Sequence, residues 1–142
     1  MKKYIGKKEI NAVHMNRLEY NNLRGWKLPE DENGTDEGYL VEYIDGGKAN
    51  HPDYKGYISW SPKDVFERAY RICESPLDRL HIEYDELMDK YNKLVLFLGR
   101  KDAKDIVGEE QFYLMDRQKV QMHDYLNTLH IRINLMKSSS NS

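Results

Sequence analysis

The chain has 142 residues and a formal net charge of −2, with 39% hydrophobic and 32% charged residues. These values are typical of a folded protein with one core or two very small ones, and they argue against a disordered chain. The charge also argues against a protein that coats a DNA or RNA polymer, because such proteins carry a large basic excess. The single cysteine, Cys73, excludes a disulfide framework or a cysteine-based zinc site within one chain and fits a reducing compartment.

The first half of the chain predicts a small antiparallel sheet with short helices. Asn16 is a typical N-cap for a short helix that ends near Arg24, before Gly25. Ser61 followed by Pro62 predicts the start of a second short helix. Segments rich in β-branched and aromatic residues predict the strands. The predicted strands are Tyr4–Ile5, 10–15, 39–44 and 57–60.

The second half predicts a long helical hairpin, because apolar residues recur there at alternating steps of three and four. On the first helix this seam comprises Leu77, Leu80, Tyr84, Leu87, Tyr91, Leu94 and Leu98, and on the second it comprises Phe112, Met115, Met122, Leu126, Leu129, Ile133 and Met136. Lys119 interrupts the second seam, and Ser75-Pro76 marks the start of the first helix. One helix pair cannot bury both seams and their flanks, so the hairpin should also pack on the N-terminal half or on another copy of the chain.

The predicted fold class is therefore α+β, in two modules. The expected organisation is an antiparallel sheet module at 1–71, a helical hairpin at 76–136 and a flexible polar tail at 137–142. No run approaches the roughly 18 apolar residues of a membrane span, and no apolar segment follows Met1, so neither a membrane anchor nor a signal peptide is expected.

A basic group with one aromatic ring lies at the end of the first long helix. Lys90, Lys93, Phe97, Arg100 and Lys101 are spaced to share one side of that helix and its exit. A ring that stacks on a base beside cations that pair with phosphate is the minimum equipment of a nucleotide site. The same pattern also fits a solvated basic face on which the ring packs against a neighbouring helix.

Arg117 and Arg132 lie on the second long helix. Arg132, near the helix end, can complement the helix dipole, or it can bind a pyrophosphate through two hydrogen bonds. The five histidines show no metal-binding spacing, and no phosphate-binding loop or nucleophile motif is present. We therefore expect no metal and no cofactor, and no pair of carboxylates is marked as catalytic although acidic residues are plentiful. The residues alone indicate a binding or interaction module and do not name its ligand.

Several segments resemble a family of small phage-encoded proteins. The N-terminal ones include Lys3-Tyr-Ile-Gly6, Tyr39-Leu-Val-Glu-Tyr43 and the run from Gly56 to Arg71, and the helical ones include Pro76 to Leu87, Lys93-Leu94, Phe97-Leu98, Tyr125-Leu126 and Arg132-Ile133. Within that group the chain is most similar to the first Thoeris anti-defence family. Members of that family bind cyclic ADP-ribose isomers, the alarm signals made by bacterial TIR enzymes, without destroying them, and they assemble as dimers and hexamers.

The resemblance implies roles for particular residues. Phe97 matches the family's base-stacking aromatic, and Arg132 matches a phosphate-pairing arginine in register. Arg117, Arg100 and Lys93 complete the expected ligand-binding set. Arg24, in the Arg-Gly-Trp motif, would serve a second pocket for cyclic trinucleotides. The histidine that accompanies it in the family is replaced by Tyr84, with His81 one turn earlier, so this chain departs from the pattern of the second pocket.

The resemblance implies a non-enzymatic phage protein that sequesters a signal such as glycocyclic ADP-ribose in the cytoplasm of the infected bacterium, as a dimer or hexamer. Two alternatives remain open at this stage. One is a phage regulatory or structural module that binds another protein through its heptads or its acidic segment Glu30–Glu37. The other is an enzyme that cleaves the signal.

Overall fold

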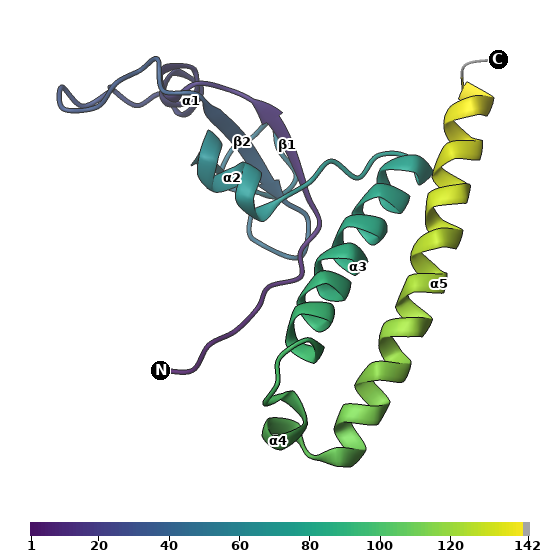
Figure 1. Ribbon diagram of the computed structural model, residues 1–142. Coiled ribbons are helices and arrows are strands. Elements are labelled where there is room, and N and C mark those ends of the chain that lie inside the picture. The colour runs from purple at the N-terminus through teal and green to yellow at the C-terminus, as the bar shows by residue number, and fades with distance from the viewer. Residues whose placement is uncertain (141–142) are drawn as a thin grey trace. The chain divides into compact units, whose positions relative to one another are not determined.

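A three-stranded antiparallel sheet is the centre of the N-terminal part of this computed structural model, which describes residues 1–140 (Figure 1). The strands are β1 (Ile10–His14), β2 (Gly38–Tyr43) and β3 (Tyr57–Pro62), in the order β1-β2-β3, with Ala12, Val41 and Ser59 in register. Helix α1 (Arg17–Arg24) follows β1, and helix α2 (Lys63–Ala69) follows β3. The chain divides into two units, and this first unit is Met1–Tyr70.

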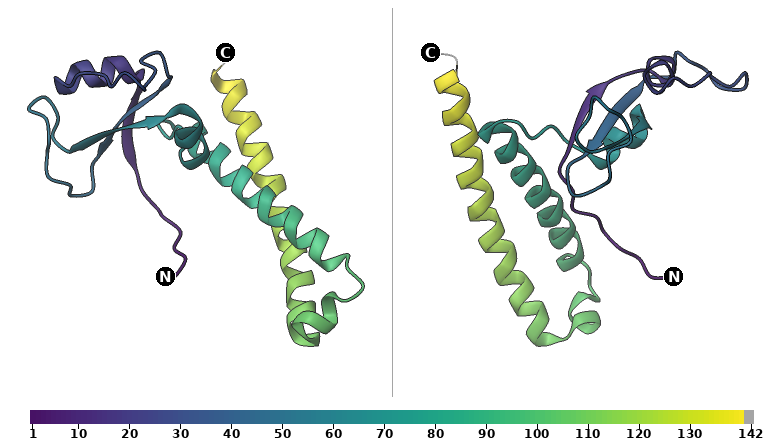
Figure 2. Two further views of the ribbon diagram at one scale, coloured as in Figure 1. Left: turned by 90° about the vertical axis from the view of Figure 1, so that its left-hand side faces the viewer. Right: turned by 180° about the vertical axis from the view of Figure 1, so that it is seen from behind.

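Alternation along β2 sends its side chains to two faces that different helices cover. Leu40 packs with Ile58 and with Tyr20 of α1, and these three residues form the buried core of the unit. The neighbouring Tyr39 lies on the other face, where the ring of Phe66 in α2 stacks on it with 3.9 Å between centroids. The two helices therefore cover opposite faces of the sheet (Figure 2).

The predicted limits of α1 are confirmed, because both of its ends are set by local chemistry. The Asn16 side chain accepts a hydrogen bond from the backbone of Glu19, and Gly25 adopts the left-handed conformation (φ 70°) that ends the helix.

Two other predictions in the first unit are wrong. Tyr4–Ile5 belongs to no strand, since β1 begins at Ile10 and no regular structure precedes it. Ser61 caps no helix, because β3 continues through Pro62 and α2 begins at Lys63 without a side-chain cap.

The second unit, which begins at Arg71, is the expected helical hairpin. It comprises α3 (Pro76–Leu98), the short α4 (Ala103–Val107) at the connection, and α5 (Glu109–Ser140), and α3 and α5 pack along their lengths (Figures 1 and 2). Ser75 and Asp78 form a capping box, in which each side chain bonds the other's backbone N–H. The start of α3 is thus as predicted.

The two apolar seams meet as their spacing predicts. Leu80, Leu129 and Ile133 are buried together, and Leu77, Tyr84, Leu87 and Met136 pack against them. Lys119, at the interruption, is half-buried and pairs with Asp116 at 3.3 Å. Helix α5 continues four residues past the expected end, through Ser140. The rest of the tail expected at 137–142, residues 141–142, lies outside the described residues. No helix within residues 1–140 is both long and apolar enough to cross a membrane.

Candidate functional site

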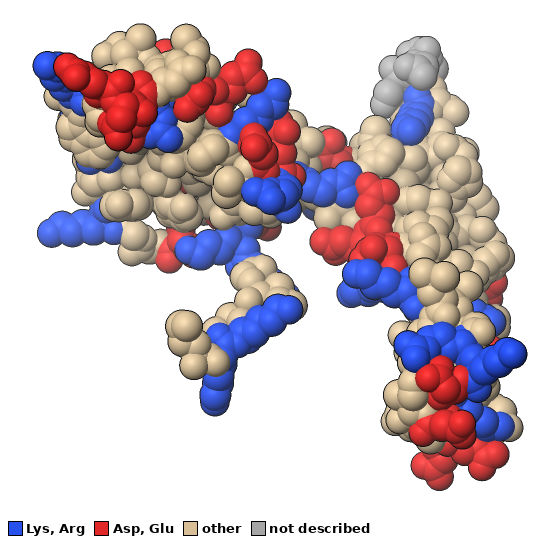
Figure 3. Space-filling view, turned by 60° about the vertical axis from the view of Figure 1, so that its left-hand side comes forward, with Lys and Arg blue, Asp and Glu red and all other residues tan. Residues whose placement is uncertain are grey.

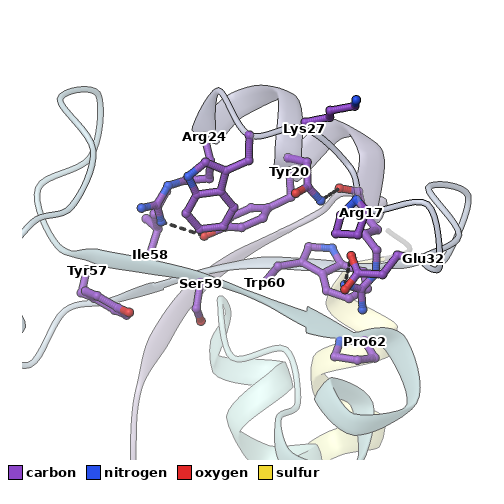
Figure 4. Close-up of a pocket in the computed structure, with 13 residues that line it drawn as sticks. Arg17, Tyr20, Arg24, Lys27, Glu32, Tyr57, Ile58, Ser59, Trp60 and Pro62 are labelled. Carbon is purple, nitrogen blue, oxygen red and sulfur yellow. Dashed lines mark hydrogen bonds and ion pairs between the residues drawn. The ribbon is translucent and has the colours of Figure 1, made fainter.

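An open pocket of about 790 Å³ lies in the first unit, between α1, the segment that follows it and β3 (Figure 4). Aromatic rings and basic side chains dominate its wall. The polar and aromatic lining residues include Arg17, Tyr20, Arg24, Trp26, Lys27, Glu32 and Trp60. With three basic residues and one acidic residue in that list, the wall carries an excess of positive charge.

Arg24 is held in this pocket by two rings. Its Nη1 donates a hydrogen bond to the hydroxyl of Tyr20 at 3.0 Å, and its guanidinium lies 4.3 Å from the ring centroid of Trp26. The left-handed turn at Gly25 makes this possible, because it reverses the chain so that the backbone N–H of Trp26 bonds to Asn21 at 2.8 Å. The Arg-Gly-Trp sequence therefore builds a stacked arginine–tryptophan pair.

Arg17 forms a similar arrangement on the other side of the pocket. Its guanidinium lies 4.4 Å from the ring centroid of Trp60 and pairs with Glu32 at 3.0 Å. Its buried Nε makes no hydrogen bond with any described group, although a carboxylate oxygen of Asp36 lies 3.9 Å away. Trp60 is fixed in turn by a 2.7 Å hydrogen bond from its Nε1 to the carbonyl of Met15.

The pocket combines flat rings with guanidinium groups, which suits a ligand that is both anionic and planar. The same contacts also have a structural role, because each arginine packs on the ring of a tryptophan. The sequence pattern indicated Arg24 as a binding residue but did not indicate Arg17 or Trp60. These two residues are 43 positions apart, and no local pattern connects them.

In the second unit, Phe97 lies in the last turn of α3 and is half-buried. Arg100 follows it, but its guanidinium already makes two hydrogen bonds of 2.9 Å to the carboxylate of Asp102. Hydrogen bonding from Arg100 lowers the pKa of Asp102, and the same contact raises the pKa of Arg100. Lys93 likewise pairs with Asp89 at 2.8 Å. A carboxylate therefore already offsets part of the positive charge that each of these two cations could offer to a phosphate.

Arg117 and Arg132 are exposed on α5, and neither forms an ion pair within residues 1–140. Arg117 lies two residues from the seam positions Met115 and Lys119, so it projects from the side of α5 that points away from α3. Arg132 immediately precedes the buried Ile133, so it lies at the flank of the seam.

Phe97 and Arg132 do not come together within one chain. The ring pairs Tyr84–His130 and Tyr91–His123, with centroids 6.2 and 6.1 Å apart, fix the register of the two antiparallel helices. Arg132 is consequently level with the second turn of α3. At about 1.5 Å per residue, Phe97 lies roughly 22 Å farther along the hairpin.

The residues expected in the second pocket lie in different units. Arg24 belongs to the first unit, whereas His81 and Tyr84 belong to α3. Tyr84 packs against the hairpin core. The grouping of these three residues stays a prediction. Within residues 1–140, no group of three or more histidine, cysteine or acidic side chains could hold a metal ion.

Part of the second unit is similar to a known protein family. Residues 74–135, which comprise the capping box, α3, α4 and most of α5, match the model of a family described as Sequestin. No curated protein and no solved structure matches the chain.

Proposed function

We propose that this protein binds a cyclic ADP-ribose-type immune signal, such as glycocyclic ADP-ribose, and sequesters it without cleaving it. The observation that carries the proposal is the match of residues 74–135 to the Sequestin family, whose name describes this behaviour. The Sequestin name indicates sequestration without naming a ligand, and the resemblance of the chain to the first Thoeris anti-defence family supports cyclic ADP-ribose isomers as the ligand class. A phage protein of this kind would act in the cytoplasm of the infected bacterium and block Thoeris-type immunity.

The surface of the hairpin supports an oligomer. Leu96 is 75% exposed on α3, and Leu135, Ile131 and Leu114 are 63%, 58% and 55% exposed on α5. Exposed apolar side chains can form part of an interface with another protein chain. We propose that a second copy of the hairpin covers these exposed side chains, which do not take part in the seam between α3 and α5.

A two-fold axis across the middle of the hairpin exchanges its two ends. Two copies packed in this way bring Phe97 of one subunit toward Arg132 of the partner subunit. The separation of roughly 22 Å within one chain, taken from the helical rise, is then no obstacle to a shared site. A cleft between two copies can also enclose a small ligand and exclude water.

The chemistry of the ligand fits these groups. The adenine of a cyclic ADP-ribose isomer would stack on Phe97, and its pyrophosphate would accept paired hydrogen bonds from Arg132. Arg100, Lys93 and Arg117 would supply further positive charge at the rim. Sequestration works by stoichiometry, so tight binding is sufficient and turnover is not needed.

Binding and release of the ligand test the proposal directly. Calorimetry with purified glycocyclic ADP-ribose should show heat of binding at micromolar protein, and mass spectrometry of material released by heating should recover the ligand intact. Altered ligand would identify an enzyme. Absence of binding would exclude cyclic ADP-ribose isomers as the ligand, and the ligand implied by the Sequestin match would have to be another molecule.

Substitutions at Phe97 test its role as a stacking ring. Phe97→Ala should weaken binding by about 1–3 kcal/mol, the usual worth of one base–aromatic stack. Phe97→Leu is the matched control, since it keeps an apolar side chain but has no ring face. If Phe97→Leu binds normally, the residue packs against protein and does not stack on a base.

Mixing two defective variants tests whether the site is shared between subunits. Phe97→Ala and Arg132→Ala should each bind poorly alone. After unfolding and refolding together, heterodimers should regain one site with both native residues, which is about one-quarter of all sites for random pairing. Calorimetry would measure this recovery. No recovery from two folded, dimeric variants would place both residues of a site in one subunit or exclude one of them.

The pocket of the first unit supports the second ligand class, cyclic trinucleotides. Arg24 stacked on Trp26 offers a cation and a ring within one open pocket. Arg24→Ala should abolish trinucleotide binding and leave cyclic ADP-ribose binding unchanged. Equal loss of both ligands would indicate that Arg24 acts on folding or assembly.

The exposed leucines also support a second candidate function, a module that binds another protein through the outer surface of the hairpin. Purification from infected cells distinguishes the two functions. A stoichiometric host or phage protein without bound nucleotide would favour the interaction module, whereas a homo-oligomer with bound nucleotide favours sequestration.

A further inference from the structure

The two edges of the sheet differ in how their backbone is protected. Along β3, the side chain of Asn50 forms two hydrogen bonds with the backbone of Ile58, accepting one from the N–H at 2.8 Å and donating the other to the carbonyl at 2.9 Å. Pro62, at the end of the same strand, has no N–H to offer. The side-chain cap and the proline therefore block strand pairing at both ends of the β3 edge.

Within residues 1–140, no side-chain cap or proline protects the β1 edge in this way. Met15 donates to the carbonyl of Gly38 at 3.0 Å, and the alternation of an antiparallel ladder turns residues 11 and 13 toward β2 as well. The backbone groups of Ile10, Ala12 and His14 consequently face outward. The strand Ile-Asn-Ala-Val-His contains neither a charged residue nor a proline, and residues 11–14 are exposed. Unprotected edges of this kind pair readily with another strand.

We propose that the β1 edge docks on the same edge of a second copy of the chain. The two β1 strands would run antiparallel about a two-fold axis at Ala12, so that Ala12 pairs with Ala12 of the partner subunit and Ile10 with His14 of the partner subunit. All three outward-facing residues then find hydrogen-bond partners. The two sheets become one continuous sheet of six strands.

Charge complementarity supports a second copy as the occupant. The segment before β1 carries Lys2, Lys3, Lys7 and Lys8, which line the N-terminal arm in Figure 3. The acidic segment 30–37 lies beside the other end of β1. Hydrogen bonds hold it there, because the backbone N–H groups of Arg17 and Leu18 donate to the carbonyls of Asp36 and Gly34, both at 3.0 Å. Antiparallel pairing carries the basic arm of each copy past that acidic end of its partner.

The arm also has apolar side chains that need cover. Tyr4 and Ile5 are 85% and 88% exposed, and both belong to the segment that sequence analysis predicts as a strand. A strand-forming pattern without a partner in its own chain is expected where the partner is another chain. This contact is separate from the hairpin contact, so a copy that makes both joins an assembly larger than a dimer.

A disulfide at the two-fold axis tests the register. In hydrogen-bonded antiparallel pairs the Cα atoms are about 5.5 Å apart, which suits a disulfide. Ala12→Cys, in a background where Cys73 is replaced by serine, should oxidise mostly to a covalent dimer on a non-reducing gel. Val13→Cys is the matched control, because the same register offsets the two Val13 residues by more than about 7 Å. Equal cross-linking of both variants, or none at Ala12→Cys, overturns the proposal.

Removing one edge donor tests the contact without a cross-link. Proline is tolerated where a strand's N–H faces outward, so Ala12→Pro should keep the fold but lose the edge contact. Its mass in native mass spectrometry should fall to half that of the wild type or less, whereas Ala12→Ser should keep the wild-type mass. A folded Ala12→Pro of unchanged mass overturns the proposal. Ligand affinity in calorimetry should be the same for both variants, which separates this contact from the proposed ligand site.

Discussion

Two arginines of the sheet unit and two arginines of α5 differ in what they contact. In the sheet unit, Arg17 and Arg24 each lie over a tryptophan and also bond to an oxygen of a neighbouring side chain. On α5, Arg117 and Arg132 have no ion-pair partner within residues 1–140. An arginine already engaged in its own unit has a structural role whether or not a ligand binds. An exposed arginine without such a partner contributes little to folding and is free to contact a ligand or a second subunit.

Buried apolar side chains are arranged differently in the two units. The sheet unit places Tyr20, Leu40 and Ile58 in one core, whereas the hairpin buries a seam that runs between two helices. Both units also leave apolar side chains exposed, among them Tyr4 and Ile5 in the sheet unit and Leu96 and Leu135 in the hairpin.

Truncating one leucine inside the seam and one outside should give the largest difference. Leu129 is fully buried, so Leu129→Ala should lower the free energy of unfolding by about 2–5 kcal/mol through lost burial and a cavity. Leu135→Ala should change it by less than about 0.5 kcal/mol in dilute protein, because Leu135 is exposed. Urea denaturation followed by circular dichroism measures both values. Similar losses for the two variants would contradict the distinction between seam and outer surface.

The next largest difference in stability is expected between replacing an arginine that contacts its own unit and replacing one that does not. Arg17→Ala should destabilise the sheet unit by about 1–2 kcal/mol, because it removes the contact with Trp60 and the ion pair with Glu32. Arg132→Ala should stay within about 0.5 kcal/mol of the wild type in unfolding but lose ligand affinity. Tryptophan fluorescence during denaturation reports on the first variant, and calorimetry reports on the second. A strongly destabilised Arg132→Ala would show that this arginine is structural.

The two Ser-Pro sequences allow a matched test of helix capping. Ser75 caps α3, so Ser75→Ala should cost about 1 kcal/mol. Ser61 caps no helix, and Ser61→Ala should fall within about 0.5 kcal/mol of the wild type. Thermal melting of both variants checks the difference. Equal effects would mean that the Ser75 cap adds nothing to the stability of the hairpin.

The smallest expected effect is a dependence of hairpin stability on acid. Hydrogen bonds from the backbone of Glu74 and from Ser75 lower the pKa of Asp78 below its ordinary value of 3.8. The folded state therefore binds this proton less readily than the unfolded state, and the contribution of Asp78 is fully present above that value and declines as the pH falls below it. Melting temperatures between pH 6 and pH 2.5 should show this loss in the wild type and a smaller one in Asp78→Asn.

Features set by neighbours in the sequence could be predicted, and those set by distant pairs could not. The caps at Asn16 and Ser75 depend on residues within three positions, and the seams depend on one helical period. The side-chain cap from Asn50 to Ile58 and the stack of Arg17 on Trp60 depend on chain reversal, which no local pattern specifies. The prediction of a strand at Tyr4–Ile5 was wrong because a strand needs a neighbouring strand to pair with, and residue preferences alone do not provide one.

The candidate site was predictable as residue types but not as an arrangement. Residue spacing predicted that Phe97 lies beside Arg100, and the structure shows that this arginine already makes two hydrogen bonds to Asp102. Spacing also placed Arg132 on the second helix, but only the register of α3 against α5 shows its distance from Phe97. A site completed by another copy cannot be read from one chain's periodicity.

The capping box at Ser75 makes the start of the hairpin a local property of the chain. It lets α3 begin without help from the residues before it, and the Sequestin match begins at the adjacent residue 74. A helix that carries its own start signal should also form behind a different N-terminal unit.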